Sequence, residues 1–313
     1  MTRDDIAVSA PGAAVVGLGI MGGAFAGHLI AAGVRTLGYD VLEDRVDVLT
    51  AQGGHSRPSA CRVAAEADLV ITSLPSVKAL EDALFGMDGL IHEARAQLLV
   101  VETSTLPLEA KERARLRLAE AGIGMLDAPV SGTGAQAKTK DISVLVSGER
   151  SGFERARGIL SHFARSVRYV GEFGAGSKVK YIANLLVAIH TLAAAEALVL
   201  GEKAGLDLKL LLDVLTDGAG TSRMLEVRGP SMVSNTYATP MIKVETFQKD
   251  LDIIAAFARQ SASPAPLFHA SIPWFTAAGA QGMNRCDTAA VVSVLRKMAG
   301  LSDEGTPEFA TTK

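Results

Sequence analysis

Short apolar runs alternate with helical stretches over the first half of the chain. The runs are solidly apolar instead of alternating with polar residues, which predicts strands that are covered on both faces. Regular alternation of strand and helix predicts a parallel, doubly wound sheet of the α/β class. The predicted strands are Ala13–Gly17, Thr36–Asp40, Asp68–Leu74, Leu98–Glu102, Gly124–Ala128, Ile142–Val146 and Val167–Val170.

The pattern changes after Gly176. Between Ser177 and Leu301 the apolar spacing is helical, and no run is convincing as a strand. The sequence therefore predicts an α/β domain over residues 12–172, an all-α domain over residues 173–301 and a mobile tail at residues 302–313. Breaks between helices are predicted at Gly205–Asp207, Gly218–Gly220, Gly229–Pro230, Pro240, Ser263–Pro266 and Gly279–Arg285.

A long apolar segment begins the all-α domain. It has no helix breaker from residue 178 to residue 203, and at 1.5 Å per residue it spans about 39 Å. Residues 182–201 have the length of a membrane span, but Asn184, His190 and Glu196 interrupt them. We therefore predict a buried helix of a soluble protein without membrane contact. Its length also predicts packing against a second subunit, in a homodimer or homotetramer.

Composition narrows the class of protein. The 313 residues are 48% hydrophobic and carry a net charge of −3, so the chain is globular and has no basic footprint for nucleic acid. The two cysteines lie far apart, and nothing is spaced like a metal site. The first residues lack the basic and then apolar run of a signal peptide, so we expect a cytoplasmic, reduced protein.

A glycine-rich motif follows the first predicted strand and begins a helix. It reads Gly17-Leu18-Gly19-Ile20-Met21-Gly22. In this context the glycines permit a tight turn, close approach of backbone amides to a pyrophosphate, and close packing of helix on strand. The helix N-terminus adds partial positive charge. The motif therefore predicts a dinucleotide-binding site.

Asp40, at the end of the second predicted strand, indicates which dinucleotide binds. Its carboxylate stands where it can accept both ribose hydroxyl protons and repel a 2′-phosphate. Glu43 and Asp44 add negative charge nearby, whereas Arg45 is the local group that favours NADP. We expect NAD as the cofactor, with NADP as the alternative.

Two further strand ends are expected to border the cofactor, because ligands of open parallel sheets lie beyond the carboxyl ends of the strands. One carries Leu74 and Pro75, and the other carries Ser104. Pro75 would turn its loop across the dinucleotide, and Ser104 or Thr105 would hydrogen-bond to the ribose or carboxamide on the nicotinamide side. Ordinary capping of the following helix explains the second loop equally well.

Two later segments carry groups suited to a small acid. The loop Ser131-Gly132-Thr133 offers backbone amides and a hydroxyl that make a cradle for a carboxylate, although it is also explained as a simple turn. Lys180 and Asn184 stand four residues apart on one helix face, and burying both costs free energy unless they have a purpose. The alternative for Lys180 is a snorkelling surface lysine. Lys178, about 200° around the helix, is expected to be solvated.

Three motifs in series give a resemblance. G-L-G-x-M-G, D-A-P-V-S-G and G-x-x-G-x-G-x-x-x-K-x-x-x-N occur in that order, and the chain from Ala13 to Arg296 resembles the β-hydroxyacid dehydrogenase family. The resemblance implies a Rossmann-type domain, an all-α substrate and oligomerisation domain, and reversible NAD(P)-linked oxidation of short 3-hydroxyacids. It further implies that Lys180 is the catalytic lysine, Asn184 its partner, and Ser131 with Gly132 the carboxylate turn.

The resemblance also assigns a cofactor contact to Ser104 and a lysine near the nicotinamide to Lys249, in a K-D-L segment. The chain departs from the family pattern at Thr133, where a second glycine is usual, and at Glu102, where an aspartate is usual. These departures leave the substrate open between 3-hydroxyisobutyrate-like and C4 sugar acids. Residues 221–230 are somewhat similar to the L-threonate branch of the family.

The predicted function is hydride transfer between NAD and a short 3-hydroxyacid, with Lys180 as general acid and base. The alternatives are an imine reductase-like enzyme and a non-catalytic NAD-binding module of the same fold. Imine reductases of this architecture usually lack the lysine, and a non-catalytic module would be expected to have lost Lys180 or Asn184; both are present. An enzyme of the 6-phosphogluconate type would need a basic phosphate clamp, which the sequence does not show.

Overall fold

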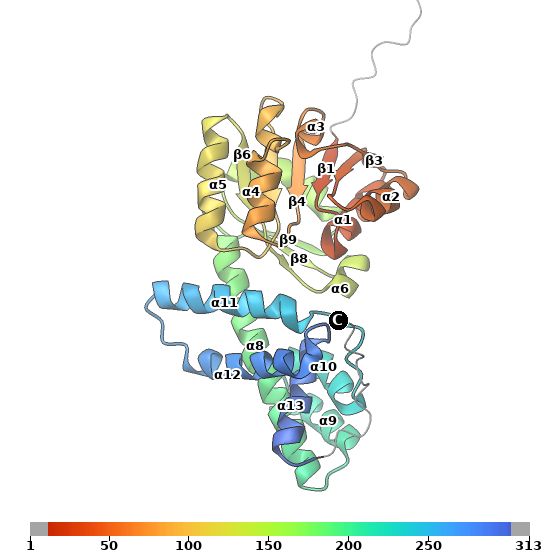
Figure 1. The fold of residues 1–313 in the computed structure, drawn as a ribbon, viewed down its shortest axis with the longest axis vertical. Coiled ribbons are helices and arrows are strands. Elements are labelled where there is room, and N and C mark those ends of the chain that lie inside the picture. Colours follow the sequence, from red (N-terminus) through yellow and green to blue (C-terminus); the bar gives the residue numbers. More distant parts are fainter. Residues whose placement is uncertain (1–11, 302–313) are drawn as a thin grey trace, which may run out of the picture. The chain divides into compact units, whose positions relative to one another are not determined.

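The computed structural model describes residues 12–301. They fall into two compact units, the first ending at Lys180 and the second beginning at Tyr181 (Figure 1). The predicted tail at residues 302–313 lies outside the described residues.

The first unit is built on a six-stranded sheet whose strands all run parallel. The first strand lies in the middle of the sheet. The second and third strands follow on one side of it and the fourth to sixth strands on the other, so the strand order reverses between the first and the fourth strand. In spatial order the strands are β3 (His55–Ser56), β2 (Thr36–Tyr39), β1 (Ala13–Val16), β4 (Leu69–Thr72), β5 (Leu99–Glu102) and β6 (Gly124–Asp127). This arrangement confirms the predicted α/β fold class, and it places a topological switch point between β1 and β4.

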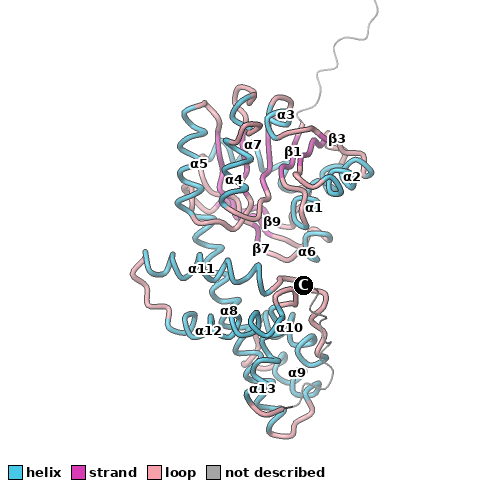
Figure 2. The backbone as a smooth tube through the Cα atoms, viewed as in Figure 1, coloured by secondary structure: helices cyan, strands magenta, loops and turns pink. Residues whose placement is uncertain are grey.

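Helices cover both faces of this sheet, as the solidly apolar strands predict. Along β1, Ala13 and Val15 face one buried cluster and Ala14 and Val16 face the other. The first cluster also holds residues of α1 (Ile20–Ala31), α2 (Glu43–Ala51) and α7 (Arg150–Ser161); the second holds residues of α3 (Ala60–Ala64), α4 (Val77–Phe85) and α5 (Leu108–Glu120), beside a short 3₁₀ turn at Leu90–His92 (Figure 2).

One detail of the sheet differs from the prediction. The strands β8 (Ser143–Val146) and β9 (Ser166–Tyr169) do not join the six-stranded sheet but form a second sheet with the short strand β7 (Val130–Ser131). After β6 the chain turns through Pro129, and β7 pairs antiparallel with β8. Asp127 and Ser147 exchange backbone hydrogen bonds as an antiparallel bridge, which leaves β8 in the wrong direction to extend β6.

The described part of the second unit contains helices, short helical turns and one isolated bridge, which agrees with the predicted all-α character. The helix α8 (Ala175–Lys203) has 29 residues, about 43 Å of helix, and reaches back into the first unit. It is followed by α9 (Leu208–Asp217), α10 (Arg223–Ser234), α11 (Val244–Gln260), α12 (Pro266–Ala278), a π turn at Gly279–Met283, a 3₁₀ turn at Thr288–Ala290 and α13 (Val291–Met298).

The predicted break at Gly229–Pro230 is wrong. Both residues lie inside α10, although a proline there removes a backbone donor from the helix. Tertiary packing overrides this local cost. Gly229 packs so closely on Leu212 that a Cβ on Gly229 would lie 2.5 Å from the Leu212 side chain. On the preceding residue, the buried Arg228, Nε lies 3.4 Å from Asp287 Oδ1.

Candidate active site

The glycine turn after β1 has the geometry that a dinucleotide needs. Gly17 has a φ of +90°, and a Cβ there would lie 2.3 Å from the carbonyl oxygen of Ser73. A Cβ on Gly22 would lie 1.9 Å from the carbonyl oxygen of Gly17, so only glycine lets α1 approach the strand this closely. Gly19 precedes the first residue of α1 without a side-chain cap, which leaves this helix N-terminus to an external anion.

Asp40 ties the glycine turn to the end of β2. Its Oδ2 accepts the backbone N–H of Leu18 at 2.7 Å, and its Oδ1 accepts the N–H of Leu42 at 2.9 Å. The side chain is buried, with Arg45 Nη1 3.2 Å from Oδ2. Asp40 therefore holds the turn in shape and also places a carboxylate beside it.

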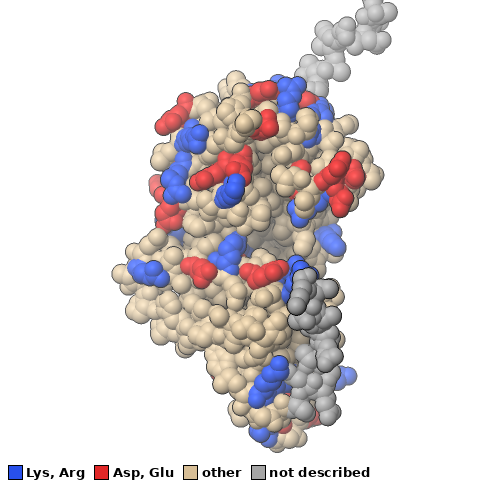
Figure 3. All heavy atoms as spheres, viewed as in Figure 1, with Lys and Arg blue, Asp and Glu red and all other residues tan. Residues whose placement is uncertain are grey.

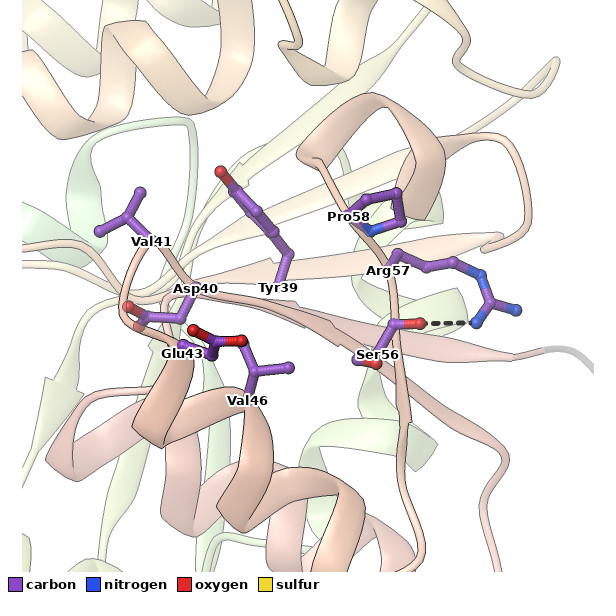
Figure 4. A pocket seen from close by; sticks show the side chains of 8 residues that line it. All are labelled: Tyr39, Asp40, Val41, Glu43, Val46, Ser56, Arg57 and Pro58. Atoms are coloured by element: carbon purple, nitrogen blue, oxygen red, sulfur yellow. Dashed lines mark hydrogen bonds between the residues drawn. The ribbon is translucent and has the colours of Figure 1, made fainter.

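A hollow beside Asp40 adjoins this end of the sheet (Figure 4). Arg57 is the basic residue that lines the hollow, and its guanidinium already forms an ion pair with the carboxylate of Glu66. The hydrogen bonds from Arg57 lower the pKa of Glu66 to about 2, so this pair is ionised at neutral pH. The lining residues are Tyr39, Asp40, Val41, Glu43, Val46, Ser56, Arg57 and Pro58.

The two loops that were predicted to border the cofactor are joined to each other. The N–H of Leu74 donates to Ser104 Oγ at 2.8 Å, and the N–H of Ser104 donates to Glu102 Oε1 at 2.6 Å. Pro75 lies between Leu74 and the Ser76 cap of α4. Ser104 is therefore fixed by its backbone while its hydroxyl proton can point elsewhere.

The predicted carboxylate turn lies between β7 and α6 (Gly134–Lys138). Gly132 has a φ of +146°, and a Cβ would meet Ile142 at 2.5 Å. The expected free amide at Thr133 is not found. Thr133 caps α6, and its N–H donates to Gln136 Oε1 at 3.0 Å in a capping box. Sequence reasoning missed Gln136, although Thr133-x-x-Gln136 is itself a capping-box signature.

The glycine turn and the carboxylate turn lie together in the first unit. Gly134 packs against Ile20, the first residue of α1, so closely that a Cβ would lie 2.4 Å from the Ile20 side chain. Farther along the same helices, His28 Nε2 lies 2.8 Å from the carbonyl oxygen of Ala137. Two motifs more than a hundred residues apart are thereby brought to one place.

The helix α8 carries the candidate acid–base residues. Lys180 is buried, with 8% of its surface exposed, whereas Lys178 is exposed. Asn184, one turn farther along, is also buried and donates from Nδ2 to Asp250 Oδ2 at 3.0 Å. The other oxygen of Asp250 is 3.3 Å from Lys249 Nζ on α11. Asn184, Lys249 and Asp250 thus form one polar group within the second unit, and sequence reasoning missed Asp250.

Charged side chains of both signs lie on the surface of both units (Figure 3). On the face shown in Figure 3, basic and acidic side chains are interspersed over both units. Ion pairs between charged side chains of the first unit include Lys78 with Asp82 and Arg150 with Glu154. No cluster of three or more His, Cys, Asp or Glu that could hold a metal ion occurs among residues 12–301.

The residues of the first unit fit a nicotinamide dinucleotide. A glycine cradle that a Cβ would fill, an uncapped helix N-terminus and a buried carboxylate at the end of β2 are the features that such a cofactor requires. Gly17 to Gly22 would hold the pyrophosphate, Asp40 the adenosine ribose, and Leu74 with Ser104 the nicotinamide half.

Comparison with known proteins identifies the family. A family model described as the NAD binding domain of 6-phosphogluconate dehydrogenase matches residues 13–171, and one described as NAD-binding of NADP-dependent 3-hydroxyisobutyrate dehydrogenase matches residues 174–295. An L-threonate dehydrogenase of Cupriavidus necator is 36% identical over 90% of this chain and 94% of its own. A 3-hydroxyisobutyrate dehydrogenase of Pseudomonas aeruginosa is 34% identical over 81% of this chain and 87% of its own.

A solved structure gives the same result. The crystal structure of a 3-hydroxyisobutyrate dehydrogenase from Salmonella typhimurium superposes with a TM-score of 0.82 and 33% identity, covering 91% of this chain and 100% of that one. The glycine turn, the parallel sheet and these matches over nearly the whole chain lead to one conclusion. The chain belongs to the β-hydroxyacid dehydrogenase family and is a nicotinamide-dependent hydroxyacid dehydrogenase.

Proposed function

We propose that this enzyme interconverts a short 3-hydroxyacid and its semialdehyde or keto form with NAD, and that it works in the cytoplasm. The observation that carries the proposal is the contact between Ile20 and Gly134, which puts a turn suited to a carboxylate beside a turn suited to a dinucleotide. The buried Lys180 belongs to the same unit and supplies a group that can exchange a proton.

In the proposed mechanism the Ser131 hydroxyl and the Gly132 amide hold the substrate carboxylate. Lys180 takes the proton of the substrate hydroxyl during oxidation and returns it during reduction, a role typically worth about 10²–10⁴-fold. Asn184 has a second amide N–H beyond the one that it donates to Asp250, and it holds the same substrate oxygen without carrying charge. When bound, the nicotinamide ring supplies the hydride acceptor or donor.

The substrate class follows from the groups around the carboxylate turn. A carboxylate at Ser131 and a hydroxyl at Lys180 suit an acid whose hydroxyl lies one or two carbons away. Phosphorylated substrates need charge-assisted clamps, and neither Ser131, Gly132 nor Thr133 is a cation. Relatives named for L-threonate and for 3-hydroxyisobutyrate support C4 sugar acids and 3-hydroxyisobutyrate-like acids alike.

A panel of short hydroxyacids tests this function. With NAD present, absorbance at 340 nm should rise with L-threonate, 3-hydroxyisobutyrate or a close analogue. Because the turn holds a carboxylate, the matching alcohol without that group should show at least tenfold lower kcat/KM. Turnover confined to phosphorylated alcohols, to non-carboxylate alcohols or to cyclic imines would contradict the proposal.

The choice of NAD over NADP has its own support. Both local arginines that could meet a 2′-phosphate are already paired, Arg45 with Asp40 and Arg57 with Glu66. Asp40 would lie against that phosphate and repel it. The Arg45 side chain is 45% exposed and is the group that would favour NADP.

Replacing Asp40 tests the cofactor assignment. The wild-type enzyme should have a higher kcat/KM with NAD than with NADP at one fixed substrate concentration. Asp40→Ala should narrow that preference by at least tenfold, because it removes the repulsion and frees Arg45. Asp47→Ala on the exposed side of α2 is the matched control and should leave the ratio unchanged. A wild-type preference for NADP would refute the role given to Asp40.

Replacing Lys180 tests the acid–base assignment. Lys180→Ala should lower kcat by about 10²-fold or more. Its dissociation constant for NAD, measured by fluorescence titration, should stay within about threefold, because Gly17 to Gly22 and Asp40 hold the dinucleotide. Lys178→Ala, two residues away and exposed, should keep its kcat. The reverse pattern would show that the helix face has been misassigned.

We also infer that the protein assembles as at least a dimer. The helix α8 is long and apolar enough to cross a membrane by length and composition, yet Asn184 and Glu196 interrupt it. Its exposed side carries Ile182 and Leu186, which are 54% and 47% exposed. Apolar area of this kind on a soluble helix favours an interface between subunits.

Light scattering over a range of protein concentrations tests the assembly. The wild type should have at least twice the mass of one chain. Ile182→Asp with Leu186→Asp should shift it toward the monomer, because two carboxylates would be buried without partners. Met87→Asp, at a residue 94% exposed in the first unit, is the control and should leave the mass unchanged. A wild-type monomer at every concentration would refute the inference.

A further inference from the structure

A buried group of charges lies under the carboxyl ends of β5 and β6, outside the mechanism described above. Glu102, Lys111 and Asp127 have fully buried side chains. Lys111 Nζ donates to Asp127 Oδ1 at 2.9 Å and lies 4.0 Å from Glu102 Oε1. Burying three ionic groups gains little stability over well-packed apolar residues. Glu102 and Asp127 also accept hydrogen bonds from two neighbouring segments.

On one side the group holds the loop that carries Ser104. Glu102 Oε1 accepts the N–H of Ser104 at 2.6 Å, and Glu102 Oε2 accepts the hydroxyl of Thr72. Ser104 Oγ in turn accepts the N–H of Leu74. Lys111 is thus linked, through Glu102, to both loops that are proposed to border the nicotinamide.

On the other side the group holds the start of α8. Asp127 Oδ2 accepts the N–H of Ser177 at 2.8 Å, and Oδ1 accepts the Ser177 hydroxyl at 2.8 Å. Ser147 Oγ donates to Asp127 Oδ2 at 3.1 Å and accepts the N–H of Gly176 at 3.0 Å. The first turn of α8 is therefore fixed to β6, and Lys180 lies three residues beyond Ser177 on the same helix.

We propose that Lys111, with Glu102 and Asp127, positions the two halves of the catalytic apparatus in the first unit relative to each other. It joins the Ser104 loop to the first turn of the helix that bears Lys180. None of the three needs to touch substrate or cofactor, so all three are positioning residues. The inference rests on the proposed role of Lys180, and it adds a buried connection between that residue and the cofactor side.

Ser177→Ala tests the connection with the charges left in place. Loss of the hydroxyl donor should loosen the first turn of α8 and lower kcat by a factor between about three and a hundred, because a small misplacement of a catalytic group is costly. The primary isotope effect on kcat, with deuterium at the carbinol carbon of the substrate, should rise as hydride transfer becomes limiting. KM for NAD should stay within about twofold.

Ser271→Ala is the matched control. Ser271 is fully buried and donates to a backbone carbonyl at 2.7 Å, but it lies on α12 in the second unit. Its loss should lower the melting temperature about as much as Ser177→Ala while kcat and the isotope effect stay at wild-type values. If both variants change kcat equally, or neither does, the proposed connection is overturned.

A second variant tests Lys111 itself. Lys111→Met combined with Glu102→Gln removes one positive and one negative charge, so the buried net charge is unchanged, and the oxygen of the new amide can still accept the N–H of Ser104. This double variant should fold with a higher melting temperature than Lys111→Met alone, which leaves two carboxylates without their ammonium. Its kcat should nevertheless fall at least threefold and its isotope effect should rise. Wild-type kcat in the folded double variant would overturn the role of Lys111.

Amide hydrogen exchange separates this inference from the proposed function. In the free protein, the amides of residues 178–184 should exchange faster in Ser177→Ala than in wild type and Ser271→Ala. This measurement needs no substrate. Absence of wild-type turnover on every hydroxyacid would refute the proposed function, whereas unchanged exchange would refute the anchoring of α8 by Asp127.

Discussion

The carboxylate of Asp127 is the interaction on which the arrangement of the first unit depends. A carboxylate buried without partners would cost several kcal/mol, by an order-of-magnitude estimate, and would favour another fold. Here it accepts hydrogen bonds from Lys111, Ser147 and both donors of Ser177. These partners come from α5, the end of β8 and the start of α8. The helices α5 and α8, the second sheet and the six-stranded sheet therefore meet at the Asp127 carboxylate. A shift of any one of them would remove a hydrogen bond from this buried group.

Much of the fold was predictable because its signals are local. Solidly apolar runs predicted the central strands. The motif from Gly17 to Gly22 predicted the turn, because the surrounding backbone leaves no room for a Cβ at Gly17 or Gly22. The features that the sequence did not predict are short or depend on pairing between distant residues. The strands β3 and β7 have two residues each, too few for any periodicity, and the second sheet depends on pairing between Val130 and Val144. Pro230 stays inside a helix because the packing of this helix, in which the neighbouring Gly229 lies against Leu212, outweighs a local preference.

The candidate site likewise contains residues that the sequence predicts and residues that it does not. Asp40 could be predicted from its position at a strand end, and the structure adds a second task, since it accepts the N–H of Leu18 inside the glycine turn. Lys180 could be separated from Lys178 by the helical period, and their burial follows that separation. Lys111 gave no signal, because a lysine in a helix rich in charge normally faces water. Only the tertiary structure brings it to Glu102 and Asp127.

The capping box at the carboxylate turn has a consequence for how this turn can change. Thr133 and Gln136 satisfy each other's backbone groups, and losing an N-cap typically costs about 0.5–2 kcal/mol. Substituting the glycine usual in the family at position 133 alone would remove the hydroxyl that accepts the N–H of Gln136, while the backbone amide at position 133 would still donate to Gln136 Oε1. The two positions are energetically coupled, so their substitutions should not be additive. Redesign or natural divergence of substrate preference at this turn would thus proceed through paired replacements, with single changes acting as intermediates of reduced stability.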